Sequence, residues 1–345
     1  MNPVALNRPP RRVPQAVREP RAPRRALHGV LLLDKPLGWS SNDALQKVKG
    51  MLRAEKGGHT GTLDPLATGL LPLCFGAATK FSQASLDADK TYRATLKLGV
   101  TRIGGDGEGE VIETRPVSFD DAALRAACAA LTGETMQLPP MHSALKREGK
   151  ALYEYARAGV EVERTPRRVV IHRLDILRWH ADELDIEVCV SKGTYIRTLA
   201  EDLGRALGCG AHLSALRRVA SGPVQLDGAI TIDALQALDP VLREQRLLPP
   251  DVLVADWPAV RLTADDAGRF LSGLRRRVEA VDCAAVRVYG PEPRAFLGSA
   301  HVKAGELIPD RLLSPPEVQA LIDASPAADT ATAAPLTESK QVSMT

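Results

Sequence analysis

Two stretches of this chain alternate strictly between apolar and polar side chains, and this pattern limits the folds that the chain can adopt. They are residues 91–98 and residues 184–190. Alternation predicts strands with one buried face, which are typical of antiparallel sheets. Across residues 195–207, apolar side chains recur every four positions, which predicts a helix that begins near Thr194. Strands and helices do not follow one another in regular β-α-β order, so we expect an α+β fold with a mixed, largely antiparallel sheet.

Further elements are expected along the main part of the chain. Residues 29–34 form a short apolar run that predicts a buried strand, and Ser40 or Ser41 can cap the helix that follows. Residues 57–69 break all periodicity and are interpreted as a loop. A second helix is predicted at 119–131 and a further strand at 168–179.

The chain divides into four regions in this interpretation. A proline-bearing stretch at 248–252 predicts a boundary between a main domain and a small barrel-like one, in which Thr263 begins a helix that reaches residue 274. Short strands are expected there at 285–289 and 295–298. The predicted regions are a basic tail at 1–28, a main domain at 29–248, a small domain at 249–313 and a low-complexity tail at 314–345.

The first of these regions is strongly basic. Residues 1–28 carry seven arginines and six prolines against one acid. Such a segment cannot bury a core, so we expect it to be disordered, either simply solvated or weakly attracted to RNA phosphate. The end of the chain, rich in Ala, Pro, Thr and Asp from Ser314 onward, is also expected to be disordered.

Composition excludes several classes of protein. No run approaches the roughly 18 to 20 apolar residues of a membrane span, and no apolar signal segment stands at the N-terminus. The five cysteines are scattered without a Cys-x-x-Cys pair, which argues against a disulfide framework and a zinc site. We therefore expect a cytoplasmic protein, away from membranes, without metal or cofactor.

The loop at 57–72 carries the most chemical information. Its glycines let the backbone turn tightly and approach a ligand closely, and the proline after Asp64 favours an extended conformation at that aspartate. A carboxylate on such a loop can act as a nucleophile or a general base, and an ordinary Asp-Pro turn is the alternative. The string Thr60-Gly-Thr-Leu63 looks like the loop of haloacid-dehalogenase-type phosphatases. Those enzymes need an aspartate just ahead of it, where this chain has Gly58-His59.

Six blocks of the chain resemble, in order, those of the bacterial tRNA pseudouridine-55 synthase family. They are the loop at 57–72 and the segments 33–41, 90–93, 149–157, 191–199 and 213–218. The resemblance is strong over 29–222 and loose over 250–313. It implies a pseudouridine synthase fold with an RNA-gripping insertion at about 140–168 and a small C-terminal PUA-like β-barrel. It also implies a monomer that isomerises one uridine in the T loop of tRNA, at position 55, without a cofactor.

The resemblance assigns roles residue by residue. Asp64 falls on the family's catalytic aspartate, Tyr92 on the tyrosine that stacks on the target base and helps to remove its C5 proton, and Arg197 on the arginine that pairs with the aspartate. The pocket for the flipped nucleotide is matched by His59, Tyr195 and Leu216, and positions near the cleft are matched by Lys35 and Asp106. Without the resemblance, the tyrosines and Leu216 would be interpreted as core residues and His59 as part of a turn. Arg197 would still need a partner such as a carboxylate, because a cation near a helix start opposes the helix dipole.

These residue types suit the implied reaction. The enzyme must break an N-glycosidic bond, turn the base and rejoin it through carbon. A carboxylate can stabilise or capture the electron-poor sugar carbon, and a neighbouring guanidinium keeps it ionised. A pocket of Tyr, His and Leu can hold the base once it has left its stack. The sequence leaves open whether Asp64 attacks the sugar or the base.

Residues 146–173 hold eight cationic side chains against four acids. A solvated charged face is the alternative interpretation, but the resemblance makes this segment the insertion that grips the T arm, with Lys146, Arg147 and Lys150 as RNA contacts. His142 stands where many family members carry a tyrosine, which leaves the contact there open. Basic residues 275–277 agree with an RNA-binding small domain.

Two other functions remain to be weighed. The chain could be an RNA-folding protein whose activity is incidental or lost, or a guide-RNA-dependent relative of the same superfamily. The presence of Asp64, Tyr92 and Arg197 together argues against lost activity. The complete insertion and the compact C-terminal module favour the stand-alone bacterial type.

Overall fold

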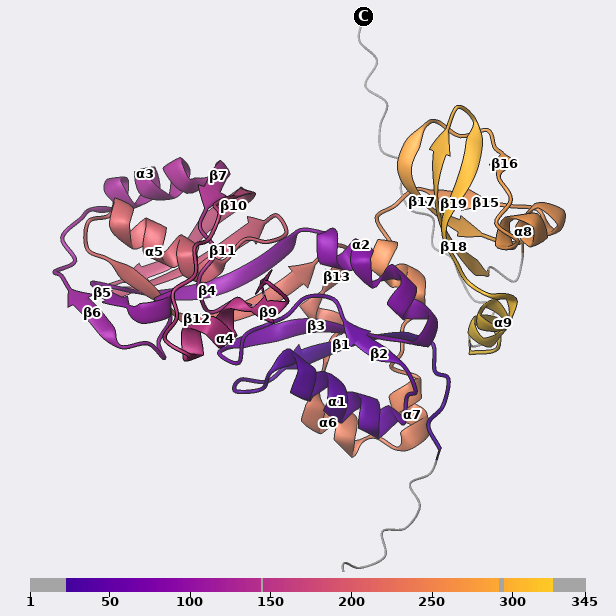
Figure 1. Ribbon diagram of the computed structural model, residues 1–345, viewed down its shortest axis with the longest axis horizontal. Helices are drawn as coiled ribbons and strands as arrows, with labels where there is room; N and C mark the ends of the chain where they lie inside the picture. Colours follow the sequence, from indigo (N-terminus) through magenta and orange to yellow (C-terminus); the bar gives the residue numbers. More distant parts are fainter. Residues whose placement is uncertain (1–22, 144, 292–294, 325–345) are drawn as a thin grey trace, which may run out of the picture.

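The computed structural model describes residues 23–143, 145–291 and 295–324, and a large sheet lies at its centre (Figure 1). The strand order is β14-β1-β3-β12-β4-β11-β10-β7, with β2 paired to β3 and β13 to β12. Only the pairs β1–β14 and β3–β12 are parallel among these described strands, so the predicted mixed, largely antiparallel sheet is confirmed. The strands are β1 (Gly29–Lys35), β2 (Gly57–His59), β3 (Ala67–Phe75), β4 (Lys90–Leu98), β7 (Gly133–Gln137), β10 (Arg167–His180), β11 (Glu183–Val190), β12 (Ala211–Ser221), β13 (Val224–Gln225) and β14 (Ile230–Thr231).

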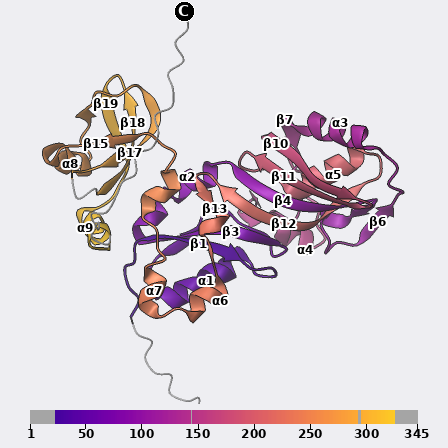
Figure 2. The same ribbon diagram turned by 180° about the vertical axis from the view of Figure 1, so that it is seen from behind.

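Two groups of helices cover opposite ends of one face of this sheet (Figures 1 and 2). Helices α1 (Ser41–Leu52) and α6 (Ile232–Ala237) pack on β1 and β3, whereas α3 (Asp121–Leu131) and α5 (Ile196–Ala206) pack on β4 and β11. Tyr92 and Leu216 contact both of the resulting core clusters, so they mark the middle of the face, between the helix groups. In the described part of the chain, no helix is long and apolar enough to cross a membrane.

The segment predicted as a loop at 57–69 differs from that prediction at both ends. Residues 57–59 form β2, and β3 already begins at Ala67. Strand β3 lies between β1 and its parallel partner β12 and is almost entirely buried, so its sequence is apolar without alternation. A strand of this kind carries no period-two signal, which is why it was not predicted.

The small C-terminal domain is a curled, open sheet with the strand order β15-β17-β18-β19-β16. Its strands are β15 (Ala259–Arg261), β16 (Arg276–Arg277), β17 (Cys283–Tyr289), β18 (Phe296–Lys303) and β19 (Glu306–Leu312), and Thr263 caps α8 (Ala264–Leu271). This half-barrel fits the predicted PUA-like domain. Phe296 packs against Phe81 of the main domain, with ring centroids 5.0 Å apart, so the two domains share one apolar cluster.

Ordered structure extends into both predicted tails. The backbone of Arg25 donates to Arg53 O at 2.8 Å, Leu27 packs on the core under α1, and His28 Nδ1 accepts from Ala77 N at 3.0 Å. The prediction of disorder is therefore wrong for residues 23–28. Their order rests largely on hydrogen bonds of the backbone, and such bonds leave no apolar pattern in the sequence. Residues 1–22 lie outside the described residues.

The C-terminal prediction is wrong in the same sense for α9 (Pro315–Ala324). The backbone and hydroxyl of Ser314 both donate to Glu317 Oε2, at 2.7 and 3.0 Å, and Val318 is buried. The string Ser314-Pro-Pro-Glu317 is the helix-start signal that the compositional argument missed. Residues 325–345 lie outside the described residues.

Candidate active site

A cavity of about 260 Å³ opens at the centre of the sheet, between the two groups of helices. Five of the predicted site residues line it: Asp64, Tyr92, Tyr195, Arg197 and Leu216. They come from segments that are far apart in the sequence, and the sheet brings them together. Lys35, His59 and Asp106 do not line this cavity.

The charged centre of the cavity is an ion pair between Asp64 and Arg197. Arg197 Nη2 lies 2.9 Å from Asp64 Oδ2, and its Nη1 lies 3.4 Å from Asp106 Oδ2. The same guanidinium donates to the backbone carbonyl oxygens of His142 at 2.6 Å and Gly104 at 3.3 Å. The Arg197 side chain is only 5% exposed, whereas that of Asp64 is 43% exposed. A buried, fully engaged cation thus holds a carboxylate that still faces the cavity.

The position of Arg197 explains why it needs these partners. It is the second residue of α5, where its charge opposes the helix dipole, and the predicted carboxylate partner is confirmed. His142 contacts Arg197 through its backbone carbonyl, whereas the contact of its side chain stays open. A backbone contact of this kind does not depend on the side chain at that position.

Asp106 lies behind Arg197 because of a glycine turn. Gly104 and Gly105 both have positive φ, 83° and 74°, which favours glycine. A Cβ on Gly105 would lie 2.7 Å from Glu201 Oε1 and 3.4 Å from Arg197 Cβ, so the glycine lets the turn pack closely against α5. Asp106 therefore orients Arg197 from outside the cavity.

The loop that carries Asp64 is held from the side of α1. Ser40 caps this helix, and Ser41 is buried with its hydroxyl bonded to both backbone groups of Leu63, donating to the oxygen at 3.0 Å and accepting from the nitrogen at 2.8 Å. Gly38 N donates to Pro65 O at 2.8 Å. These bonds fix the backbone on both sides of Asp64.

Tyr92 and Tyr195 enter the cavity from rigid elements. Tyr92 is half-buried on the central strand β4, on the same face as Ala94 and directly opposite Arg218 of β12. Tyr195 precedes α5, and the buried Gln137 side chain bonds to its backbone, accepting from N at 2.7 Å and donating to O at 3.1 Å. Burial raises the pKa of Tyr195, so its hydroxyl is neutral at ordinary pH.

Lys35 and His59 support the cavity from behind. Lys35 is fully buried, and its Nζ donates to Pro36 O at 2.9 Å and Trp39 O at 2.6 Å, which holds the turn that contacts Pro65. Burial lowers the pKa of Lys35 to about 8. His59 is half-buried on β2, and burial and then the charge of Arg218 lower its pKa.

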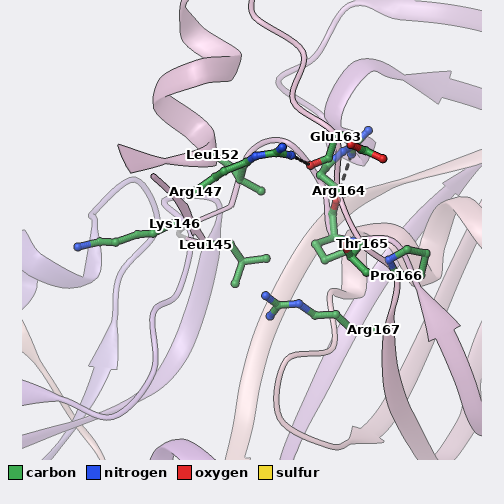
Figure 3. Close-up of a pocket in the computed structure, with 10 residues that line it drawn as sticks. Leu145, Lys146, Arg147, Leu152, Glu163, Arg164, Thr165, Pro166 and Arg167 are labelled. Carbon is green, nitrogen blue, oxygen red and sulfur yellow. Dashed lines mark hydrogen bonds between the residues drawn. The ribbon is translucent and has the colours of Figure 1, made fainter. Parts of the chain in front are cut away.

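A second cavity of about 530 Å³ lies in the predicted insertion (Figure 3). It is lined by Lys146 and Arg147 of β8 (Lys146–Arg147) and by Arg164 and Arg167, with Glu163 as the acid. Figure 3 shows Arg147 reaching toward Glu163, whose backbone oxygen accepts a hydrogen bond from it.

Lys150, the third predicted RNA contact, lies in β9 (Lys150–Ala151), outside the lining of this cavity. Its Nζ stands 4.9 Å from the centre of the Tyr155 ring. All three predicted RNA contacts are exposed. They therefore lie on one exposed hairpin, although only two of them face the second cavity.

Several residues of the first cavity were not predicted from the sequence. Ser143, Lys90, Lys192 and Arg218 all line it. Arg218 shares a face of β12 with Leu216, but β12 itself was not predicted as a strand, so no local pattern indicated this. Lys192 pairs with Asp87 at 2.8 Å, a contact between distant segments that no local pattern indicates.

Comparisons with known proteins agree with this geometry. The model of the TruB family pseudouridylate synthase N-terminal domain matches residues 49–196, and two models of TruB C-terminal domains match 197–255 and 258–313. A protein named tRNA pseudouridine synthase B from Cupriavidus pinatubonensis is 56% identical over 306 residues, which are 86% of this chain and 97% of that protein. The chain belongs to the TruB family of pseudouridine synthases. A relative of the same name from Ralstonia nicotianae is 55% identical over 300 residues, 84% of this chain and 96% of that protein.

Solved structures support the fold of this TruB-family enzyme. A chain from a Cbf5-Nop10-Gar1 complex superposes with a TM-score of 0.66 at 24% identity, over 85% of this chain and 87% of that chain. A chain from an H/ACA RNP bound to a substrate RNA gives 0.64 at 22% identity, over 84% and 86%. The predicted pseudouridine synthase fold and enzyme class are confirmed.

Proposed function

We propose that this enzyme isomerises uridine to pseudouridine in the T loop of tRNA, at position 55, with Asp64 as its nucleophile. The observation that carries the proposal is the carboxylate of Asp64, which faces the central cavity while the buried Arg197 holds it at 2.9 Å. The names of the relatives at 55–56% identity, tRNA pseudouridine synthase B, support the substrate. The enzyme works as a monomer in the cytoplasm, without a cofactor.

The reaction needs an anion at the point where the glycosidic bond breaks. The guanidinium of Arg197 pairs with the carboxylate of Asp64, and Asp106 shares that guanidinium from behind. The exposed oxygen of Asp64 is then free to attack the sugar carbon or the base, and both routes fit this arrangement. The hydrogen bonds of Ser41 to Leu63 keep the carboxylate in place during the reaction.

The flipped base is held by the other side chains of the cavity. The ring of Tyr92 stacks on the base, and its hydroxyl takes part in removing the C5 proton. Tyr195 and Leu216 line the same space and limit how the detached base can turn. His59, Lys35 and Asp106 contribute by holding the walls.

RNA outside the target nucleotide is bound by exposed cations. Lys146, Arg147 and Lys150 neutralise phosphates of the T arm, and the main domain (29–248) and the PUA-like domain (249–313) share the rest of the RNA. Insertion residues 140–168 lie beside the reaction cavity in this proposal. Ser143 belongs to the insertion and also lines the cavity that holds Asp64, so it connects the insertion with the reaction cavity.

The test is incubation of the purified enzyme with an unmodified tRNA transcript, followed by mapping of pseudouridine at single-nucleotide resolution. We expect one modified position in the T loop, and no product in a matched transcript with cytidine at that position. Pseudouridine only outside the T loop would contradict the substrate assignment. A protein that only folds RNA would leave every uridine unchanged.

A further inference from the structure

Among the described residues, Arg218 is the largest side chain that is almost completely buried, with 1% exposure, and it lines the reaction cavity. It lies on β12 between β3 and β4, directly opposite Gly69 on one side and Tyr92 on the other. Arg217, its neighbour in the sequence, points to the opposite face and pairs with Asp34 at 2.6 Å. Two adjacent arginines thus serve different faces of the same sheet.

The guanidinium of Arg218 joins the two ends of the loop that carries Asp64. Its Nε donates to Leu70 O at 2.7 Å, and its Nη2 donates to Gly61 O at 3.2 Å. These two carbonyls stand on either side of residues 62–69. One rigid, planar group therefore sets the distance between the start and the end of that segment.

Two glycines make this arrangement possible. Gly61 and Gly69 have φ values of 112° and 96°, in the region that favours glycine. A Cβ on Gly69 would lie 2.3 Å from the backbone oxygen of Arg218, and a Cβ on Gly61 would lie 3.4 Å from its Nη1. Gly69 therefore leaves room for the backbone of Arg218, and Gly61 lies in ordinary contact with its guanidinium.

Arg218 forms no ion pair with a carboxylate of the described residues. Within the residues that the structure describes, no carboxylate oxygen lies within 4.0 Å of its guanidinium. The positive charge of Arg218 acts on a neighbouring lysine. Burial lowers the pKa of Lys90 to about 8, and the charge of Arg218 contributes to this shift. A buried cation without a paired acid is costly, so its retention at the cavity wall calls for a role.

We propose that Arg218 is the positioning residue of this active site, which fixes the Asp64 loop against Tyr92 and supplies a buried positive charge to the cavity. The inference rests on the proposed function. Arg218 acts through the backbone of the loop and through its field, since its burial keeps it from forming a broad contact with RNA. Ser41 and α1 hold the same loop from its other side.

The experiment compares Arg218→Met, Arg218→Lys and the matched control Arg217→Met. For each variant and the wild type, the single-turnover rate at saturating tRNA, the Kd for tRNA, the melting temperature and the pKa of His59 by NMR are measured. For Arg218→Met we expect the rate to fall by about a hundredfold, as for a misplaced catalytic group, while Kd changes less than about threefold. The pKa of His59 should rise, because a charge that lowers it has been removed. Arg217→Met should leave all four values near those of the wild type.

Arg218→Lys keeps the charge but not the planar fork, so we expect a rate about tenfold below the wild type with a wild-type His59 pKa. A wild-type rate for this variant, combined with an unfolded Arg218→Met, would reduce Arg218 to a folding role and overturn the proposal. A rate within threefold for folded Arg218→Met, or an unchanged His59 pKa, would also overturn it. If the wild type itself forms no pseudouridine, the proposed function fails, whereas the His59 measurement still tests the field of Arg218.

Discussion

The reaction cavity and the insertion cavity are both lined by cations, but they are built in opposite ways. In the first, Arg197 and Arg218 are buried, and hydrogen bonds to backbone carbonyls and carboxylates fix them. In the second, Lys146 and Arg147 are exposed on a two-stranded hairpin, and the lining comes from residues 139–167 alone. Fixed charges suit bond-breaking at one atom, whereas exposed cations suit a flexible polyanion. The two regions should therefore respond differently to mutation and to salt.

The largest expected effect is at Asp64. Asp64→Asn preserves the shape of the side chain but removes the anion, so the single-turnover rate should fall at least about a thousandfold, as when a nucleophile is lost. The Kd for tRNA should stay within about threefold, because the exposed cations of the insertion are untouched. Rapid quench and filter binding measure the two quantities. A residual rate within tenfold of the wild type would remove Asp64 from its proposed role.

The next effect separates the ring of Tyr92 from its hydroxyl. Tyr92→Phe should keep most tRNA binding, because stacking of about 1 to 3 kcal/mol per base survives. Its rate should fall about a hundredfold, as is usual when an acid–base group is lost. Tyr92→Ala should lose both binding and rate. A Phe variant with a normal rate would make Tyr92 a packing residue only.

The insertion should show its effect in salt dependence. Replacing Lys146, Arg147 and Lys150 together with Gln should lower the slope of log Kd against log salt by about 2 to 3, since each phosphate contact contributes somewhat less than one. A control that replaces Lys97, Arg125 and Arg178 removes three cations that each already pair with an acid. This control should leave the slope unchanged. Equal slopes for the two triple variants would exclude the hairpin from the RNA interface.

The smallest expected effect concerns the basic N-terminus, which resembles the insertion in its excess of cations. Removal of residues 1–22 should leave the melting temperature unchanged, whereas removal of residues 1–28 should lower it by about 3 °C or more, because Leu27 packs on the core and His28 bonds to Ala77. Scanning calorimetry of both truncations measures the difference. Identical melting temperatures would show that the contacts of residues 25–28 add no stability.

The sequence predicts best where one face of an element is buried. Strands β4 and β11 and helix α5 were found within two residues of their ends from periodicity. Strands β3 and β12 were not predicted, because β3 is buried on both faces and β12 carries Arg217 and Arg218 in its middle. Periodicity therefore described the side of the cavity formed by β4 better than the side formed by β12.

The candidate site shows a similar division. The pairing of Arg197 with a carboxylate followed from its place at a helix start, whereas the choice of Asp64 came from the family resemblance. Lys35 and Asp106 were predicted to lie near the cleft, and the structure places both outside the cavity lining. Whether a charged residue near a site faces the substrate or supports its wall depends on packing between distant segments, which a single sequence does not reveal.

The central claim is that one region of the molecule performs the reaction and another binds the RNA. Measuring both the rate and the Kd of two variants tests it. Asp64→Asn and the Lys146, Arg147 and Lys150 triple variant are assayed side by side with one tRNA, for the rate at saturating enzyme and for Kd. The account predicts that the first variant loses its rate and keeps its Kd, whereas the triple variant weakens Kd and reaches a near-normal rate at saturation. A triple variant that binds normally but cannot react, or an Asp64→Asn protein that reacts normally, would contradict it.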